Sequence, residues 1–113
     1  MANFALFVEL KAKPGMESEV EAFLNGEAKL VREEVGTLTW HGAKDEGEPG
    51  VYVVFDTFND EAAREAHLNG EAGRELVANA ERLFSHVKVH RLGVVAEKYA
   101  IEAAPSYKNN AGR

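Results

Sequence analysis

Cysteine is absent from this sequence of 113 residues. Its absence excludes disulfides, thiolate nucleophiles and thiolate-ligated zinc or iron–sulfur clusters. Basic residues are also few, since 13 Lys and Arg stand against 19 Asp and Glu and give a formal charge of −6. A chain of this charge repels phosphate backbones, and no segment concentrates Lys or Arg. We therefore expect no nucleic-acid partner.

Long apolar runs are lacking too. No segment approaches the roughly 18 to 20 apolar residues that span a bilayer, so we expect no membrane partner. The first residues lack the basic start and small-residue cleavage site of a signal peptide, and we expect a soluble, cytoplasmic protein. The glycine-rich segments match neither the dinucleotide-binding nor the P-loop spacing, so no phosphate cradle is indicated.

The pattern of apolar residues predicts one domain over residues 1–97 and a C-terminal tail over residues 98–113 that docks on a partner subunit. Alternating or β-branched segments predict strands, and 3.6-residue periodicity predicts helices. The strands are expected at 3–12, 37–44, 51–58 and 86–97, and the helices at 16–34 and 60–84. We expect Asn25-Gly26 to weaken the first helix and Asn69-Gly70 to interrupt the second. The inner side of the second helix is assigned to Leu76, Val77, Ala80, Leu83 and Phe84.

The resulting order, β-α-β-β-α-β, predicts an α+β, ferredoxin-like fold with one antiparallel four-stranded sheet and both helices on one face. The third strand, however, is apolar on both sides, with Val53 and Phe55 opposite Tyr52 and Val54. A second apolar face needs a cover, and a copy of the same chain supplies one by symmetry. We therefore predict a homodimer.

Four segments carry a family resemblance: the turn Lys13-Pro14-Gly15, the helix exit Glu33-Glu34-Val35-Gly36, the strand 51–58 (VYVVFDTF), and the helix 61–68 (EAAREAHL) closed by Asn69-Gly70. Together they resemble the antibiotic biosynthesis monooxygenase family of small dimeric α/β-barrel proteins, over roughly residues 4–96. The resemblance implies a pocket between helices and sheet. It also implies oxidation of quinols or polycyclic phenols by O2 without metal or flavin, or haem degradation in a related branch.

The match to the family pattern is incomplete. Asp56 and His67 match an acidic residue and a histidine of the pattern, but Phe58 stands where oxygenating members carry a tryptophan. Val54 and Val8 stand where oxygenating or haem-degrading relatives carry asparagines. Residues 71–84 contain no histidine that could serve as an axial ligand, so haem degradation is disfavoured.

Asp56, Phe58 and His67 are expected to mark the mouth of a small-molecule pocket of at least a few hundred Å3 between the second helix and the sheet. The catalytic candidates are His67 and Asp56. His67 has alanine neighbours, and its ordinary pKa of about 6.5 suits proton exchange near neutral pH. The alternative is a structural histidine bonded to Asp56 or to a backbone carbonyl. Asp56 either orients His67 or caps the turn into the helix.

The substrate-binding candidates are Trp40, Phe58, Tyr52, Val54 and Val8. Trp40 has a large face that suits an aromatic ligand, although core or dimer packing also explains it. His41 points to the opposite side of its strand and is expected in solvent or at the dimer seam. His86 and His90 lie about 13 Å apart along a strand at roughly 3.3 Å per residue, so we predict no metal site there.

These residues lead to one hypothesis and two alternatives. We expect a cofactor-independent monooxygenase that oxidises a small quinol or phenolic aromatic with O2, with no cofactor and no metal. His67 assists deprotonation, Asp56 orients it, and Trp40 and Phe58 hold the ring. The alternatives are a non-catalytic dimer that binds a small apolar molecule, and a cofactor-free isomerase or lyase on the same fold.

Overall fold

The computed structural model describes residues 2–98. Along the chain the elements are β1 (Phe4–Ala12), α1 (Glu17–Val31), β2 (Thr37–Lys44), β3 (Val51–Phe58), α2 (Glu61–Asn69), α3 (Glu71–Leu83) and β4 (Phe84–Gly93). The predicted second helix is therefore two helices, because the chain is extended at Gly70, which ends α2 and precedes α3.

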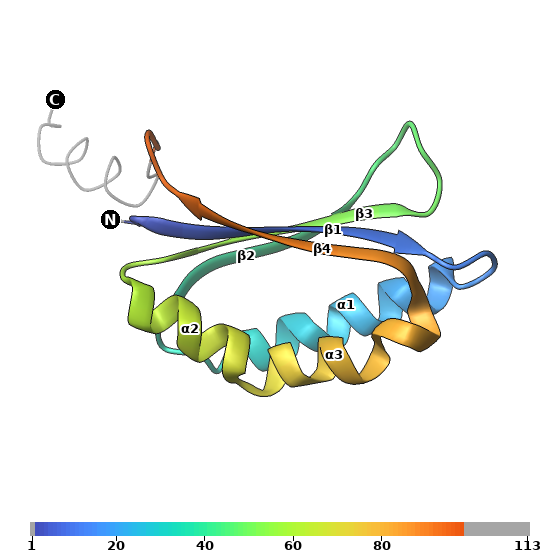
Figure 1. The fold of residues 1–113 in the computed structure, drawn as a ribbon, viewed down its shortest axis with the longest axis horizontal. Coiled ribbons are helices and arrows are strands. Elements are labelled where there is room, and N and C mark those ends of the chain that lie inside the picture. The colour runs from blue at the N-terminus through green and yellow to red at the C-terminus, as the bar shows by residue number, and fades with distance from the viewer. Residues whose placement is uncertain (1, 99–113) are drawn as a thin grey trace, which may run out of the picture.

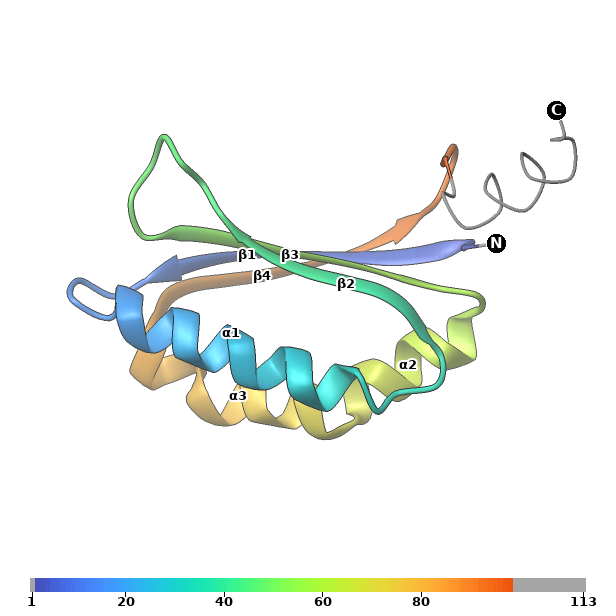
Figure 2. The ribbon, with the colours of Figure 1, turned by 180° about the vertical axis from the view of Figure 1, so that it is seen from behind.

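The strands form one antiparallel sheet in the order β2-β3-β1-β4. Figures 1 and 2 show the helices α1, α2 and α3 on the same face of this sheet, and no helix within residues 2–98 covers the opposite face. This arrangement confirms the predicted α+β, ferredoxin-like fold with a single four-stranded sheet. The termini of β1 and β4 meet at one end, where Phe4 pairs with Gly93.

The strand register separates the two faces of the sheet. Val8 pairs with Val54 and Leu10 pairs with Tyr52, and all four side chains are buried under the helices. The core continues from them into the helices and the strand ends, through Ala12, Val20, Leu83 and Phe84. On the open face Phe7 pairs with Phe55, whose side chain is 39% exposed. Both faces are thus apolar, as the alternation predicted.

Three sequence predictions need correction. α1 runs through Asn25-Gly26 without a break and ends at Val31, three residues before the predicted end. β4 spans Phe84–Gly93 instead of 86–97. It ends where Gly93 pairs with Phe4, the first residue of β1, and one further backbone hydrogen bond joins Val94 N–H to the Asn3 carbonyl. Val77 was assigned to the inner side of its helix but is 79% exposed, since it lies about 100° around α3 from Leu76.

Within residues 2–98, none of the helices has the length and apolar character that a membrane crossing requires. Except for Lys98, the predicted C-terminal tail lies outside the described residues.

Gly73 sets how closely α3 approaches the end of α2. A Cβ at this position would lie 2.1 Å from the Leu68 carbonyl oxygen, which is backbone and cannot rotate away. We expect Gly73→Ala to lower the free energy of unfolding by about 3 kcal/mol, as overpacking does. Denaturant unfolding measures the change.

The matched control is Gly26→Ala in α1, where a Cβ would meet nothing within 4 Å. Alanine is the better helix former there, so Gly26→Ala should raise the free energy of unfolding by about 0.5–1 kcal/mol. Equal effects of the two substitutions would contradict the proposed close contact at Gly73.

Candidate functional site

The corner between β3 and α2 brings together Asp56 on the strand and His67 on the helix. β3 ends at Phe58, and Asp60 caps α2 by accepting a hydrogen bond of 2.8 Å from the Ala63 N–H. Within α2 the buried residues are Arg64 and His67, three positions apart on one side of the helix. That side faces the sheet, so His67 lies over the helix-facing side chains of β3.

His67 is bonded at both ring nitrogens. Its Nε2 lies 3.1 Å from Asp56 Oδ2 on β3, and its Nδ1 lies 2.7 Å from Glu34 Oε1 in the connection between α1 and β2. The Thr37 hydroxyl donates a hydrogen bond of 2.6 Å to the same oxygen of Glu34. The approach of this connection to α2 depends on Gly36, because a Cβ there would lie 2.7 Å from Ala63 Cβ.

The two carboxylates determine the charge of His67. Burial by itself lowers the pKa of the imidazole, but the hydrogen bonds with Asp56 and Glu34 outweigh it, and the pKa of His67 is raised. Burial also raises the pKa of Asp56, against the opposing hydrogen bond from His67. Both partners thus hold a proton more tightly than usual. Since each ring nitrogen faces a carboxylate oxygen, we assign the extra proton to His67, which is an imidazolium that donates two hydrogen bonds.

Asp56 has one uncommitted oxygen. Its side chain is 1% exposed, Oδ2 faces His67, and Oδ1 has no hydrogen-bond partner among the described residues. A buried acceptor without a partner is costly, and a ligand hydroxyl or amide would relieve that cost.

Asp56 and His67 line a cavity between the sheet and the helices, together with Leu6, Val8, Leu10, Phe23, Leu24, Glu27, Trp40, Val54, Leu68, Ala72, Gly73, Leu76 and Val89. We call it the inner cavity. Its volume is about 50 Å3, far below the few hundred Å3 predicted from the sequence. Large side chains of the core fill the difference, so an aromatic ring does not fit beside His67 in this conformation.

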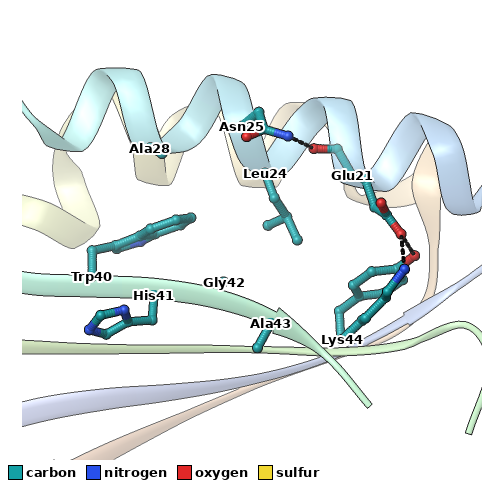
Figure 3. Close-up of a pocket in the computed structure, with 10 residues that line it drawn as sticks. Glu21, Leu24, Asn25, Ala28, Trp40, His41, Gly42, Ala43 and Lys44 are labelled. Carbon is teal, nitrogen blue, oxygen red and sulfur yellow. Dashed lines mark hydrogen bonds and ion pairs between the residues drawn. The ribbon is translucent and has the colours of Figure 1, made fainter. Parts of the chain in front are cut away.

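A larger hollow lies on the other side of Trp40. Between α1 and β2 an outer groove of about 420 Å3 is lined by Glu21, Leu24, Asn25, Ala28, Trp40, His41, Gly42, Ala43, Lys44 and Tyr52. Figure 3 shows the Trp40 ring extending from β2 toward α1, between Ala28 and Leu24, while His41 points away on the opposite side of β2. Trp40 also lines a third hollow of about 310 Å3 that includes Glu34 and Thr37. Trp40 is therefore part of the wall between the inner cavity and two surface hollows, and Leu24 shares the wall toward the outer groove.

The other predicted site residues fall into separate places. Val8 and Val54 line the inner cavity, whereas Tyr52 lines the outer groove and donates a hydrogen bond of 2.8 Å to Glu21. Phe58 is fully buried and lines none of the hollows described above. Its ring packs against the His67 imidazole with centroids 5.4 Å apart.

His86 and His90 both contact Glu9 on the open face of the sheet, at 3.2 and 2.6 Å. They are on the opposite side of the sheet from His67. Within residues 2–98, no group of three or more His, Asp or Glu side chains is arranged to hold a metal ion.

Two acids of the site were missed as candidates. Glu34 was identified only as part of a helix exit, and nothing in the local sequence places it against a histidine 33 positions away. Glu27 lines the inner cavity and is only 7% exposed. Its spacing contained a signal, because an acid at position 27 lies on the same helical stripe as Val20, Leu24 and Val31.

The fold and the site together define a small ferredoxin-like α+β protein with an acid–histidine–acid cluster between its sheet and helices. Residues 3–79 match the family model described as antibiotic biosynthesis monooxygenase. The chain belongs to this family. Among curated proteins, none matches the sequence.

Solved structures support the assignment of the fold. A protein of unknown function from Nitrosomonas europaea is 41% identical, with a TM-score of 0.82, and the match covers 88% of this chain and 95% of that one. A protein from Pseudomonas aeruginosa is 25% identical, with a TM-score of 0.76 and coverage of 85% and 97%. One from Mycobacterium tuberculosis is similar in fold at 19% identity, with a TM-score of 0.78 and coverage of 87% and 100%.

The acid–histidine–acid cluster predicts which of its two carboxylates changes the pKa of His67 more. We expect Asp56→Asn to lower the pKa of His67 more than Glu34→Gln does, because the bond to Asp56 is the larger of the two that raise it. NMR titration of the His67 ring measures both shifts. A larger fall in Glu34→Gln would contradict the assigned roles.

The same pair should make stability depend on pH. Because the pKa of His67 is raised in the folded state, the folded protein binds its proton more tightly than the unfolded chain. The resulting stabilisation is complete below the ordinary value of about 6.5 and is lost as the pH rises through the folded pKa. Asp56→Asn should flatten this part of the curve in urea unfolding measured over pH.

Proposed function

We propose that the protein is a cofactor-independent monooxygenase that oxidises a small hydroxylated aromatic, a phenol or quinol, with O2. The observation that supports the proposal most is the buried Oδ1 of Asp56 at the wall of the inner cavity, which has no hydrogen-bond partner within residues 2–98. The site offers an acceptor for an uncharged hydroxyl, and its carboxylates repel an anionic ligand. Family membership supports the reaction type.

The ligand hydroxyl gives its proton to Asp56 Oδ1, so that the O–H bond of the ligand breaks and a carboxylic O–H forms. His67 is not the base in this scheme, because both of its nitrogens already donate to carboxylates. It holds Asp56 in position as an ionised acceptor. The phenolate then donates electrons to O2. One oxygen atom ends in the quinone. The other leaves as water, whose two hydrogens are the proton that Asp56 returns and the proton released when the ring C–H bond at the oxidised carbon breaks. The substrate itself therefore supplies all the electrons.

In this proposal the ligand reaches Asp56 past Trp40. The aromatic ring of the ligand is larger than the inner cavity, but the ring of Trp40 borders that cavity and the outer groove alike. Displacing it joins about 50 Å3 to about 420 Å3, within the range of ligand pockets. The indole then stacks on the ligand ring and keeps water out.

Oxygen uptake with a panel of quinols and phenols tests the proposal, using protein free of metal and flavin. We expect Asp56→Asn to reduce the rate at least about a hundredfold, as the loss of a proton-transferring group does. Asp45→Asn is the matched control, since Asp45 lies in the exposed β2–β3 connection and the change is chemically the same. If no compound consumes oxygen faster with the native protein than with Asp56→Asn, the proposal fails for that panel. Turnover that persists without oxygen would indicate an isomerase or lyase.

The small volume of the inner cavity favours a second candidate, a dimer that binds a small apolar molecule without converting it. The same panel, measured by thermal shift, separates the two functions. Compounds that bind in the groove at Trp40 and raise the melting temperature, but cause no oxygen uptake, support binding alone.

We also propose that the protein is a homodimer joined through the open face of the sheet. The support is an apolar surface opposite the helices, formed by Phe7, Val51, Val53, Phe55 and Leu92. Phe55 and Leu92 are 39% and 38% exposed in the single chain. The antibiotic biosynthesis monooxygenase family, whose members are typically dimeric, agrees with this arrangement.

Light scattering after gel filtration tests the dimer. Phe55→Glu should yield monomers, because it places a charge in the middle of the proposed interface. Val77→Glu introduces the same charge at a residue of α3 that is 79% exposed, on the helix side, and should leave the oligomeric state unchanged. A monomeric native protein would disprove the dimer, and a Phe55→Glu protein that stays dimeric would disprove this interface.

A further inference from the structure

Glu27 occupies the wall between two cavities. It lines the inner cavity with Asp56 and His67. It also lines a surface hollow of about 320 Å3 between α1 and α3, which is formed with Phe23, Gly26, Leu30, Glu71 and Glu75. The side chain is 7% exposed, yet it borders both spaces. We call the second space the outer hollow.

Among residues 2–98, no side-chain hydrogen bond or ion pair of the Glu27 carboxyl is present. Burial without such a partner favours the neutral acid and raises the pKa of Glu27 to about 7, so that the neutral and the ionised form are both populated near neutral pH. The charged groups around it are His67 on α2, which opposes the shift, and Glu75 on α3 and Glu34 after α1, which add to it. Asp56 on β3 and Glu71 on α3 line the two spaces that it borders.

We propose that Glu27 is the group through which the inner cavity exchanges protons with solvent in the outer hollow. The inference rests on the proposed function, because Asp56 takes up and returns a proton in each turnover, and Glu27 connects that proton with solvent. The role is that of a relay within the site.

The transfer can be written in balanced steps. The carboxylic O–H of Asp56 breaks and a carboxylic O–H of Glu27 forms, across the inner cavity that both residues line. Glu27 then releases the proton to water in the outer hollow and is charged again. A cavity of about 50 Å3 has room for bridging water, since one water centre needs about 10–15 Å3, and both carboxyls can bond it. No electrons move, and no co-reactant is required.

Exchange of the His67 Nε2–H proton with solvent measures this path without any ligand. Its partner Asp56 is buried at the wall of the inner cavity, whereas Glu34, the partner of Nδ1–H, is 22% exposed and gives that proton a separate route to solvent. At pH 7 we expect Glu27→Gln, which keeps the shape and removes the ionisable group, to slow exchange at least about tenfold in NMR saturation-transfer experiments. Glu27→Asp should restore part of the rate.

Glu75→Gln is the matched control. Glu75 lines the outer hollow but not the inner cavity, so its loss should leave the exchange rate within about twofold of the native value, a change too small for loss of a proton-transfer group. An unchanged exchange rate in Glu27→Gln, or equal slowing in Glu75→Gln, would overturn the proposal. If no compound of the panel above causes oxygen uptake, but proton exchange still depends on Glu27, the oxygenase proposal is contradicted and the relay is not.

The variants are expected to fold. In the native protein Glu27 keeps its proton up to about pH 7, whereas the unfolded chain loses it near 4.5. Stability therefore falls as the pH rises between these values. Glu27→Gln should remove that fall and raise the melting temperature at pH 8 but not at pH 4. A melting temperature equally changed at both pH values would show that Glu27 is not neutral when buried.

Discussion

The bonds of His67 to two carboxylates hold the functional half of the structure together. Through Asp56 they attach α2 to β3, and through Glu34 they attach it to the connection that leads from α1 into β2. Within the described part of the chain, the helices cover one face of the sheet (Figure 1), and these contacts tie them to it at the end away from the main core. Breaking a buried pair leaves an uncompensated charge, so the position of α2 and the charge state of the site cannot vary independently.

The charge balance of the site follows from that arrangement. One imidazolium faces two carboxylates, and a third acid, Glu27, borders the same cavity. With Glu27 neutral, the cluster has one more negative than positive charge, and ionising Glu27 adds another. Such a site favours uncharged donors over anions. The raised pKa of Glu27, about 7, therefore places the change between the two charge states near neutral pH.

Much of the fold could be predicted because local patterns agree with it. The two-sided apolar strand Val51–Phe58, the cap at Asp60 and the inward-facing His67 are all encoded within a few neighbouring residues. Glu34, the second partner of His67, could not be predicted in this way, because it reaches the histidine only where a loop packs against α2. The volume of the inner cavity could not be predicted either, because side-chain packing and not periodicity decides it. The end of β4 depended on where β1 begins, which is again a property of the pairing.

The position of Trp40 reconciles a small inner cavity with a family of ligand-converting proteins. A rigid wall at this position would leave Asp56 inaccessible to anything larger than a few water molecules. The indole, however, is anchored only at β2, an edge strand, and its ring is bordered by open space on two sides. Moving it costs fewer packing contacts than moving a core residue such as Leu10, which is 2% exposed. Ligand entry by this route leaves the sheet, the helices and the bonds of His67 in place.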